Sequence, residues 1–298
     1  MNSKVQSLKA FLGQADRVAL VEVAATKGST PREAGAFMLV SASAIFGTIG
    51  GGQLEYMAID KARQMLRPSS PSKGREARIE VDEVCATLDV PLGPEIGQCC
   101  GGRVEVLIRL VDGSLEQQLI ANAQSEEAHL PHVYVFGGGH VGQALAASLA
   151  LLPIHAVVVE TRADALEGMP DTVETRLTPM PEAVVREAPA GSAFAILTHD
   201  HALDFLIVAE ALKRDDTAYV GMIGSKTKKA TFRSWFLRSA EGSEAQFARL
   251  VSPIGGSAVK DKRPQVIAAL AAAEIMTALV SHAAQAPISS TSKKVMVG

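Results

Sequence analysis

Three glycines in the stretch HVYVFGGGHVG (132–142) have the spacing G-x-G-x-x-G: Gly137, Gly139 and Gly142. They follow β-branched and aromatic residues typical of a buried strand and precede a helix-like run, 141–152. The first glycine permits a tight turn, the second lets a phosphate approach the backbone, and the third lets the helix pack against the strand. With Gly138 and His140 between them, these residues are predicted to bind an anion at the helix start.

A second predicted strand, 156–159, ends in Glu160. In dinucleotide-binding folds a carboxylate about 20 positions after the first glycine binds the ribose, and Glu160 has that place. Arg162 could leave room for a 2′-phosphate, as in NADP-binding proteins. The order of strand, turn, helix, strand and acid predicts a Rossmann-like domain, but a phosphate turn does not identify what carries the phosphate.

A third group of polar residues, THDH (198–201), ends another predicted strand. Ligands bind at the carboxyl ends of strands in open α/β sheets, so this group is a candidate site. His199 and His201 could be metal ligands, acid–base groups or polar residues of a helix start; a metal is least favoured because no third ligand is evident. Asp200 could simply cap the following helix, and Asp204 could do no more than complement its dipole.

A fourth candidate follows the last predicted strand, 217–222, where Gly224, Ser225 and Lys226 precede further lysines at a helix start. A glycine turn with serine and several lysines favours an anion. It is not a Walker A loop, because the G-x-x-x-x-G-K spacing is absent. The alternative is a basic, solvated helix start.

The first half of the chain has its own glycine turn, Gly50–Gly52, between the predicted strand 45–49 and a helix. Gly51 and Gly52 could open an anion-binding helix, or serve only because glycine permits backbone conformations denied to other residues. Glu55, in the first turn, could simply complement the helix dipole.

An earlier loop, TKGSTPREAG (26–35), has two interpretations. The favoured one is a long connection with Gly and Pro turns. The other is a polar loop that contacts an anionic ligand through Lys27, Ser29, Thr30 and Arg32.

The segment GQCCGG (97–102) has the most unusual composition in this half. Its cysteines do not have the spacing of a zinc site, and free thiols are often ordinary small hydrophobes. Flanking glycines, however, expose a thiol to a ligand, and sulfur suits a soft metal or a sulfur-bearing cofactor.

Composition excludes several classes of protein. The 298 residues are 47% hydrophobic with a net charge of −3, enough for a core and without the basic run of a nucleic-acid-binding protein. No uninterrupted apolar stretch spans a membrane; the closest, 266–280, contains Glu274 and suits a packed helix. The N-terminus reads as an amphipathic helix without a secretory apolar region, and three cysteines suit a reducing cytoplasm.

The predicted fold class is α/β: a Rossmann-like parallel-sheet domain preceded by a smaller α+β domain. The expected parts are an N-terminal domain over 1–130, a Rossmann-like domain over 131–260, a closing helix over 261–286 and a flexible tail over 287–298. Further expectations are a strand at 75–81, an irregular stretch at 89–95 and a polar linker at 125–130. Because both halves have glycine turns, we expect a ligand between them.

The order of these segments resembles the xanthine dehydrogenase accessory protein family, XdhC/CoxI. The likeness rests on GSTPREAGAFMLV (28–40), GTIGGGQLE (47–55), GQCCGG (97–102), VFGGGHVG (135–142), THDHALD (198–204), GMIGSK (221–226) and SPIGG (252–256). One departure follows Gly255: the family usually continues with a leucine and a Thr-Pro-Glu-Glu-type helix start, whereas this chain has Gly256 and DKRP (261–264).

The resemblance implies a molybdenum cofactor chaperone that supports cofactor sulfuration with a cysteine desulfurase and passes the cofactor to the molybdenum-binding subunit of xanthine dehydrogenase. Gly137, Gly139 and Gly142, or Ser225 and Lys226, would take the cofactor's phosphate. The cysteine that matches the family's Cys-Gly-Gly is Cys100, the candidate nearest the molybdenum. Gly51, Gly52, Gln98, His199 and Asp200 complete the expected cofactor-binding set. A homo-oligomer is compatible with this role.

Two other functions stay open at this point. An NAD(P)-dependent oxidoreductase would use the glycine turn and Glu160, with His199 or His201 as acid–base group. A scaffold would keep the Rossmann domain without a ligand. GQCCGG favours the chaperone, since a hydride-transfer enzyme has no evident need of it.

Overall fold

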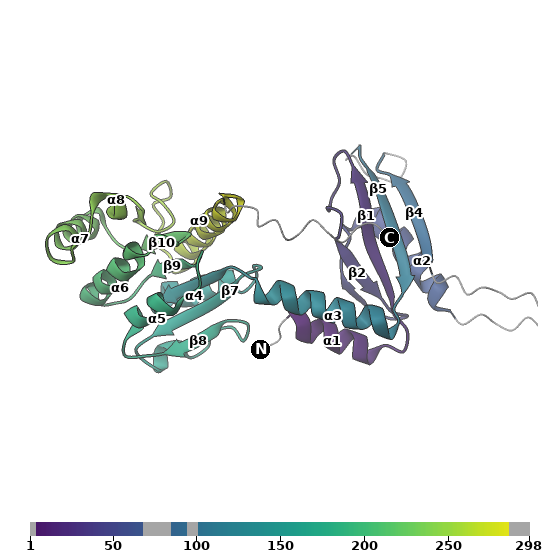
Figure 1. Ribbon diagram of the computed structural model, residues 1–298, viewed down its shortest axis with the longest axis horizontal. Coiled ribbons are helices and arrows are strands. Elements are labelled where there is room, and N and C mark those ends of the chain that lie inside the picture. Colours follow the sequence, from purple (N-terminus) through teal and green to yellow (C-terminus); the bar gives the residue numbers. More distant parts are fainter. Residues whose placement is uncertain (1–3, 68–84, 94–100, 286–298) are drawn as a thin grey trace, which may run out of the picture. The chain divides into compact units, whose positions relative to one another are not determined.

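The computed structural model describes residues 4–67, 85–93 and 101–285. Contacts between residues divide the chain into two compact units, residues 2–127 and residues 128 onward. Each buried cluster of apolar side chains lies within one unit. Figure 1 labels the helices and strands of both units.

The second unit is built on six parallel strands in the order β11-β10-β9-β6-β7-β8. This is the doubly wound order of a Rossmann fold, and its strand order reverses between β6 and β9. The strands are β6 (His132–Phe136), β7 (His155–Glu160), β8 (Glu174–Leu177), β9 (Ala193–Ile196), β10 (Tyr219–Met222) and β11 (Leu250–Val251).

Helices cover both faces of this sheet (Figure 1). Along β6, Val133 and Val135 pack toward one face and Tyr134 and Phe136 toward the other, because successive side chains of a strand alternate. The first face is covered by α4 (His140–Leu149) and α9 (Pro264–Gln285). The other face is covered by α5 (Pro181–Glu187), α6 (His201–Lys213) and α7 (Lys226–Ser239); the short helices η2 (Asp164–Leu166) and α8 (Glu244–Phe247) complete the unit.

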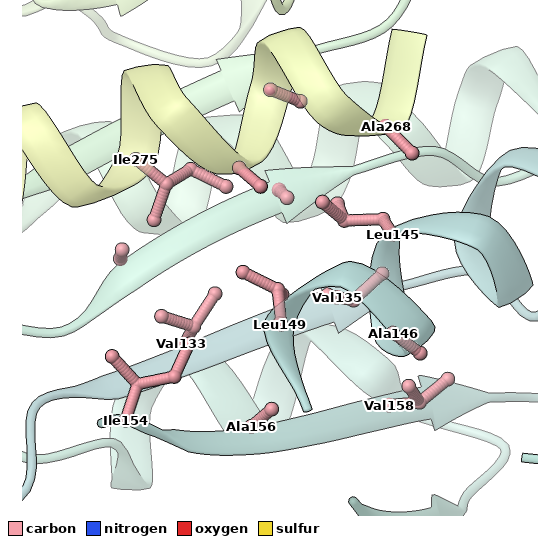
Figure 2. Packing of buried hydrophobic residues seen from close by; sticks show 14 of the residues in the cluster. Val133, Val135, Leu145, Ala146, Leu149, Ile154, Ala156, Val158, Ala268 and Ile275 are labelled. Carbon is pink, nitrogen blue, oxygen red and sulfur yellow. The ribbon is translucent and has the colours of Figure 1, made fainter. Parts of the chain in front are cut away.

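Among the described helices, α9 has the length and hydropathy of a membrane-crossing segment. One side of it nevertheless packs in the core: Ala268 and Ile275 are fully buried, on the side of the helix toward α4 and the sheet (Figure 2). Its Glu274 accepts hydrogen bonds from the Tyr219 hydroxyl and from Gly255 N, the latter at 3.2 Å. The packed helix predicted around Glu274 is confirmed.

The first unit is an antiparallel sheet with strand order β3-β2-β1-β5-β4. Along β1, Ala19, Val21 and Val23 pack toward α2, and Leu20 packs toward α1 and α3. The strands are β1 (Ala19–Lys27), β2 (Phe37–Val40), β3 (Ile45–Gly47), β4 (Cys85–Pro91) and β5 (Arg103–Leu110), and the helices are α1 (Lys4–Gln14), α2 (Gly52–Leu66) and α3 (Gly113–Ala128). A Rossmann-like domain after an N-terminal domain with an antiparallel sheet agrees with the predicted fold class.

One local prediction is wrong. The stretch predicted to be irregular from residue 89 belongs to β4 as far as Pro91, whose partner on β5 is Arg103. Apolar residues at every second position, Ala86, Leu88 and Val90, were the strand signal in the sequence, although Asp89 and Pro91 obscured it. In the stretch predicted to link the domains, α3 continues as far as Ala128, because Glu126, Glu127 and Ala128 are good helix formers, and the division between the two units lies between residues 127 and 128. The expected strand at 75–81 and the tail lie outside the described residues.

Candidate functional site

The turn after β6 requires glycine at three positions for reasons internal to the fold. A Cβ on Gly137, which has φ +112°, would lie 2.7 Å from the Leu197 carbonyl oxygen. A Cβ on Gly138 would lie 2.3 Å from the Ala165 oxygen, and one on Gly142 would lie 1.9 Å from the Gly137 oxygen. Backbone packing therefore excludes side chains at all three positions.

Gly139 is different. Its φ of −69° is open to any residue, it is exposed, and a Cβ there would meet no atom within 4 Å. It is the N-cap of α4, where the first N–H groups of a helix lack intrahelical acceptors. Nothing within the fold demands glycine at this position, and its bare backbone faces space that an anion can enter.

Glu160 closes the same turn from the end of β7. The side chain is 5% exposed, and its carboxylate accepts hydrogen bonds from Gly138 N and Thr161 N, both at 2.8 Å, and from Arg162 N at 3.2 Å. Burial alone would raise the pKa of Glu160, but these N–H groups and the Arg162 guanidinium outweigh burial and lower it to about 2. Glu160 is therefore an ionised internal acceptor that fixes the glycine loop, a role that the sequence did not reveal.

At the end of β9, Asp200 caps α6 by accepting hydrogen bonds from Ala202 N at 2.8 Å and Leu203 N at 3.4 Å. The capping alternative is thus confirmed for this residue. His199 and His201 are exposed. In the described part of the chain no group of three histidine, cysteine or acidic side chains is arranged to hold a metal ion.

Asp204 lies fully buried one turn into α6, and the expectation that it only complements the helix dipole is wrong. Its Oδ1 accepts from Thr198 N at 3.0 Å and from Thr198 Oγ1 at 2.7 Å, and its Oδ2 pairs with Lys228 Nζ. Lys228, on α7, is itself buried. This ion pair ties the loop after β9 to the first turn of the helix after β10.

The loop after β10 presents fewer cations than its sequence indicates. Ser225 caps α7 by accepting from Lys228 N at 3.2 Å. Lys228 forms an ion pair with Asp204. Lys229 Nζ lies 3.3 Å from the Leu250 oxygen and above the Phe247 ring. Of the lysines at this helix start, Lys226 is the exposed one, beside the serine hydroxyl.

Four of the predicted groups lie at one edge of one sheet. The strands β10, β9, β6 and β7 are consecutive neighbours and parallel, so their carboxyl ends are adjacent. The loops that follow them carry the predicted residues Gly137–His140, Glu160, His199, Asp200, Ser225 and Lys226. The edge combines three helix starts and an exposed lysine, which is suited to binding an anion.

In the first unit, Gly50, Gly51 and Gly52 all have positive φ, so the backbone itself requires glycine there. The Glu55 carboxylate accepts from Ile49 N at 3.0 Å and Gly51 N at 3.1 Å. Burial raises its pKa, but hydrogen bonds from Thr48, Gly51 and Ile49 dominate and lower it. Glu55 therefore fixes the glycine turn, which is more than the dipole role expected of it. Its carboxylate also accepts the hydrogen bond of Gly51 N, a group that was expected to donate to a ligand.

Three motif segments of the first unit meet in space. A Cβ on Gly28 would lie 3.3 Å from Gly102 Cα, and one on Gly50 would lie 2.8 Å from the Pro31 ring. Gly101 N donates to the Leu92 oxygen at 2.9 Å. Gln98 and Cys100 lie outside the described residues, and their assignment to the cofactor and the metal stays a prediction.

Fold and site together define a Rossmann-type domain whose carboxyl edge is suited to binding an anion, joined to an α+β unit with converging glycine loops. Comparison with known families matches residues 133–275 to the XdhC Rossmann domain and residues 12–75 to the XdhC and CoxI family. The chain belongs to the XdhC and CoxI family, the xanthine dehydrogenase accessory proteins that its motifs resemble.

Individual relatives add fold information. An uncharacterized Escherichia coli K12 protein, YqeB, is 28% identical over 270 residues; the match covers 87% of this chain but 43% of YqeB, so the chain spans less than half of that relative. A Bacillus halodurans crystal structure described as a xanthine dehydrogenase has a TM-score of 0.75 and 18% identity, covering 94% of this chain and 96% of the other. That structure shares the fold.

Proposed function

We propose that the protein is an accessory factor in the maturation of a xanthine dehydrogenase, which binds the molybdenum cofactor as cargo in the cytoplasm. In this role it supports cofactor sulfuration together with a cysteine desulfurase and delivers the cofactor to the molybdenum-binding subunit. Family membership supports the maturation role.

The observation that carries cofactor binding is the accessible backbone of Gly139. The cofactor has a phosphate, and the first N–H groups of α4 can donate to it. The fold does not require glycine at position 139, so a close approach by a ligand is the remaining reason for its lack of a side chain. Ser225 and Lys226, two strands away at the same edge, supply a hydroxyl and a cation. We therefore propose that this edge holds the phosphate.

The metal end of the cofactor would lie near a soft ligand, and Cys100 is our candidate. Gly101, which follows Cys100 in the sequence, packs beside Gly28. The chain after the cysteine segment therefore lies next to the glycine loop that contains Gly28. Molybdenum held by dithiolene sulfur supplies the redox and sulfur chemistry once the cofactor is in its enzyme; the proposed contribution of this chain is binding and release.

An NAD(P)-dependent oxidoreductase is the alternative that the Rossmann strand order favours. Ribose recognition would require Glu160 to exchange internal hydrogen bonds, including the one from Gly138, for those of a ligand. That cost weighs against a nicotinamide cofactor in this chain.

The first test is the substitution Gly139→Asp. An aspartate at an N-cap supports the helix and has an allowed φ here, so we expect unfolding stability to change by less than about 0.5 kcal/mol. The new carboxylate would occupy the phosphate position, so retention of cofactor should fall at least tenfold. The measurement is fluorescence of the oxidised pterin extracted from purified protein. Ala190→Asp, which adds the same charge in the exposed turn before β9, is the control and should retain cofactor.

The second test is Cys100→Ala, which should weaken cofactor retention or transfer to apo-xanthine dehydrogenase without unfolding the chain. Unchanged retention and transfer would remove Cys100 from the mechanism. Extraction of nicotinamide in place of pterin would overturn the proposal in favour of a dehydrogenase. Extraction of neither, from cells that make the cofactor, would favour a scaffold.

A further inference from the structure

The first unit contains a cavity of about 530 Å³ that the proposed function does not use. All of its lining residues belong to this unit; they come from α1, α3, the sheet face that these helices cover, and the loop 32–36. Its volume falls within the roughly 300–1,000 Å³ typical of small-molecule sites. The cavity is therefore large enough for an organic ligand.

Much of the lining of this cavity is apolar. Leu20 of β1, Phe37 of β2 and Phe46 of β3 line it from the sheet, and Leu8 and Leu119 line it from the helices. These residues belong to the buried cluster between the sheet and the pair α1 and α3, or pack against it (Figure 1). Aromatic and aliphatic walls of this kind favour a flat apolar body.

The same sheet wall also carries charge, since Glu22 lies opposite Phe37 and Arg109 lies opposite Leu20. Arg109 Nη2 pairs with Glu22 Oε2 at 3.1 Å, and the two side chains are 39% and 33% exposed. The Arg109 Nε atom is buried and has no hydrogen-bond partner. A buried donor of this kind favours the arrival of an acceptor, because it has lost water without gaining a partner.

A second guanidinium increases the positive charge. Arg32 lines the cavity, and within the described residues its side chain has no hydrogen bond or ion pair. Lys4 pairs with Glu126 at 2.7 Å across α1 and α3. The lining thus holds three cations against two carboxylates, Glu22 and Glu126, and can accept a single negative charge.

We propose that this cavity binds a small aromatic carboxylate. Its ring lies against Phe37 and Phe46, and its carboxylate pairs with the guanidinium groups of Arg32 and Arg109. Arginine suits this task because its planar N–H groups match a carboxylate. Of the four residues that the less favoured interpretation of the loop 26–35 names as ligand contacts, Arg32 lines the cavity.

The cavity is independent of the proposed phosphate edge, which contributes no residue to its lining. The probe is 2-naphthoate, titrated into the full-length protein by calorimetry, with uncharged 2-naphthylmethanol as ligand control. We expect one molecule to bind. Arg32→Gln should weaken its binding about fivefold and Arg109→Gln about tenfold or more, because the buried donor contributes more than an exposed ion pair.

Arg67→Gln is the matched control: Arg67 is an exposed arginine of the same unit, beside α2 and outside the cavity lining. It should leave the affinity unchanged. Because Arg109→Gln also leaves Glu22 unpaired, the double variant Glu22→Gln/Arg109→Gln tests the same contact without that charge imbalance. Absence of binding, equal affinity for 2-naphthylmethanol, or equal weakening by all three arginine variants would overturn the assignment.

Discussion

At the scale of single residues, two carboxylates perform the same task in the two units. Glu55 accepts hydrogen bonds from the turn 48–51, and Glu160 accepts from Gly138. Both are ionised acceptors, since hydrogen bonds lower the pKa of each below its ordinary value. A glycine-rich turn loses much conformational entropy on ordering, and an internal anion that collects its N–H groups offsets part of this cost.

The substitution Glu160→Gln tests this role. We expect it to lower the free energy of unfolding at pH 7 by about 2 kcal/mol, because an amide replaces charge-assisted acceptors. The folded-state pKa of about 2 lies below the ordinary value of 4.5, so the stabilisation is present above pH 4.5 and is lost as pH falls toward 2. Urea unfolding at a series of pH values should show the two proteins converging in acid.

Glu167→Gln is the control, an exposed carboxylate of the same unit, and should match the parent protein throughout. A difference between parent and Glu160→Gln that stayed constant from pH 7 to pH 3 would show that the effect is steric and unrelated to charge.

At the scale of elements, the Asp204–Lys228 pair couples two helices that begin at neighbouring strand ends. Asp204 belongs to α6 and Lys228 to α7, and Thr198 joins them from the β9 loop. The pair thereby sets how the loop with His199 and the loop with Ser225 lie at the candidate phosphate edge. It contacts the site only through these loops, so it is a positioning device.

A double-mutant cycle measures this coupling. Asp204→Leu and Lys228→Met should each cost about 3–5 kcal/mol, because each leaves its partner charged and buried. The double variant should recover a substantial part of the loss. The exposed pair Arg233 and Glu244 provides the reference cycle, with a coupling energy below about 1 kcal/mol. Additive losses for Asp204 and Lys228 would contradict the buried-pair interpretation.

At the scale of the whole molecule, the chain has two units with separate cores. The apolar clusters around α2 and around α1 and α3 belong to residues 2–127, and those on the two faces of the parallel sheet belong to residues 128 onward. No cluster within the described residues crosses between them. Each unit can therefore bury its own apolar surface.

A fragment of residues 128–285 should accordingly fold by itself. We expect one cooperative urea transition and the same midpoint shift on Glu160→Gln as in the full chain, since the residues that hold the glycine turn are all present. Circular dichroism of the fragment measures both. A gradual urea transition that lacks a folded baseline would show that the fragment needs the first unit for stability.

Local patterns were enough to predict most of the parallel sheet. Strand β6, the glycine turn and strand β7 could be placed because apolar runs and glycine spacing are properties of neighbouring residues. The same approach failed at β4, where a proline and an aspartate obscured the alternation that pairing with β5 creates. It also missed β11, which is two residues long and exists through its pairing with β10.

The sequence by itself determined the family, the Rossmann character and the candidate residues, because each depends on residue types at fixed spacing. Only the tertiary structure decided which of those residues remain available to a ligand. Gly138 donates to Glu160 and Lys228 is paired with Asp204, whereas Gly139 and Lys226 are exposed. The physical reason is that the acceptors of these donors, Glu160 and Asp204, are distant from them in the sequence. Only folding brings each donor within hydrogen-bond distance of its acceptor.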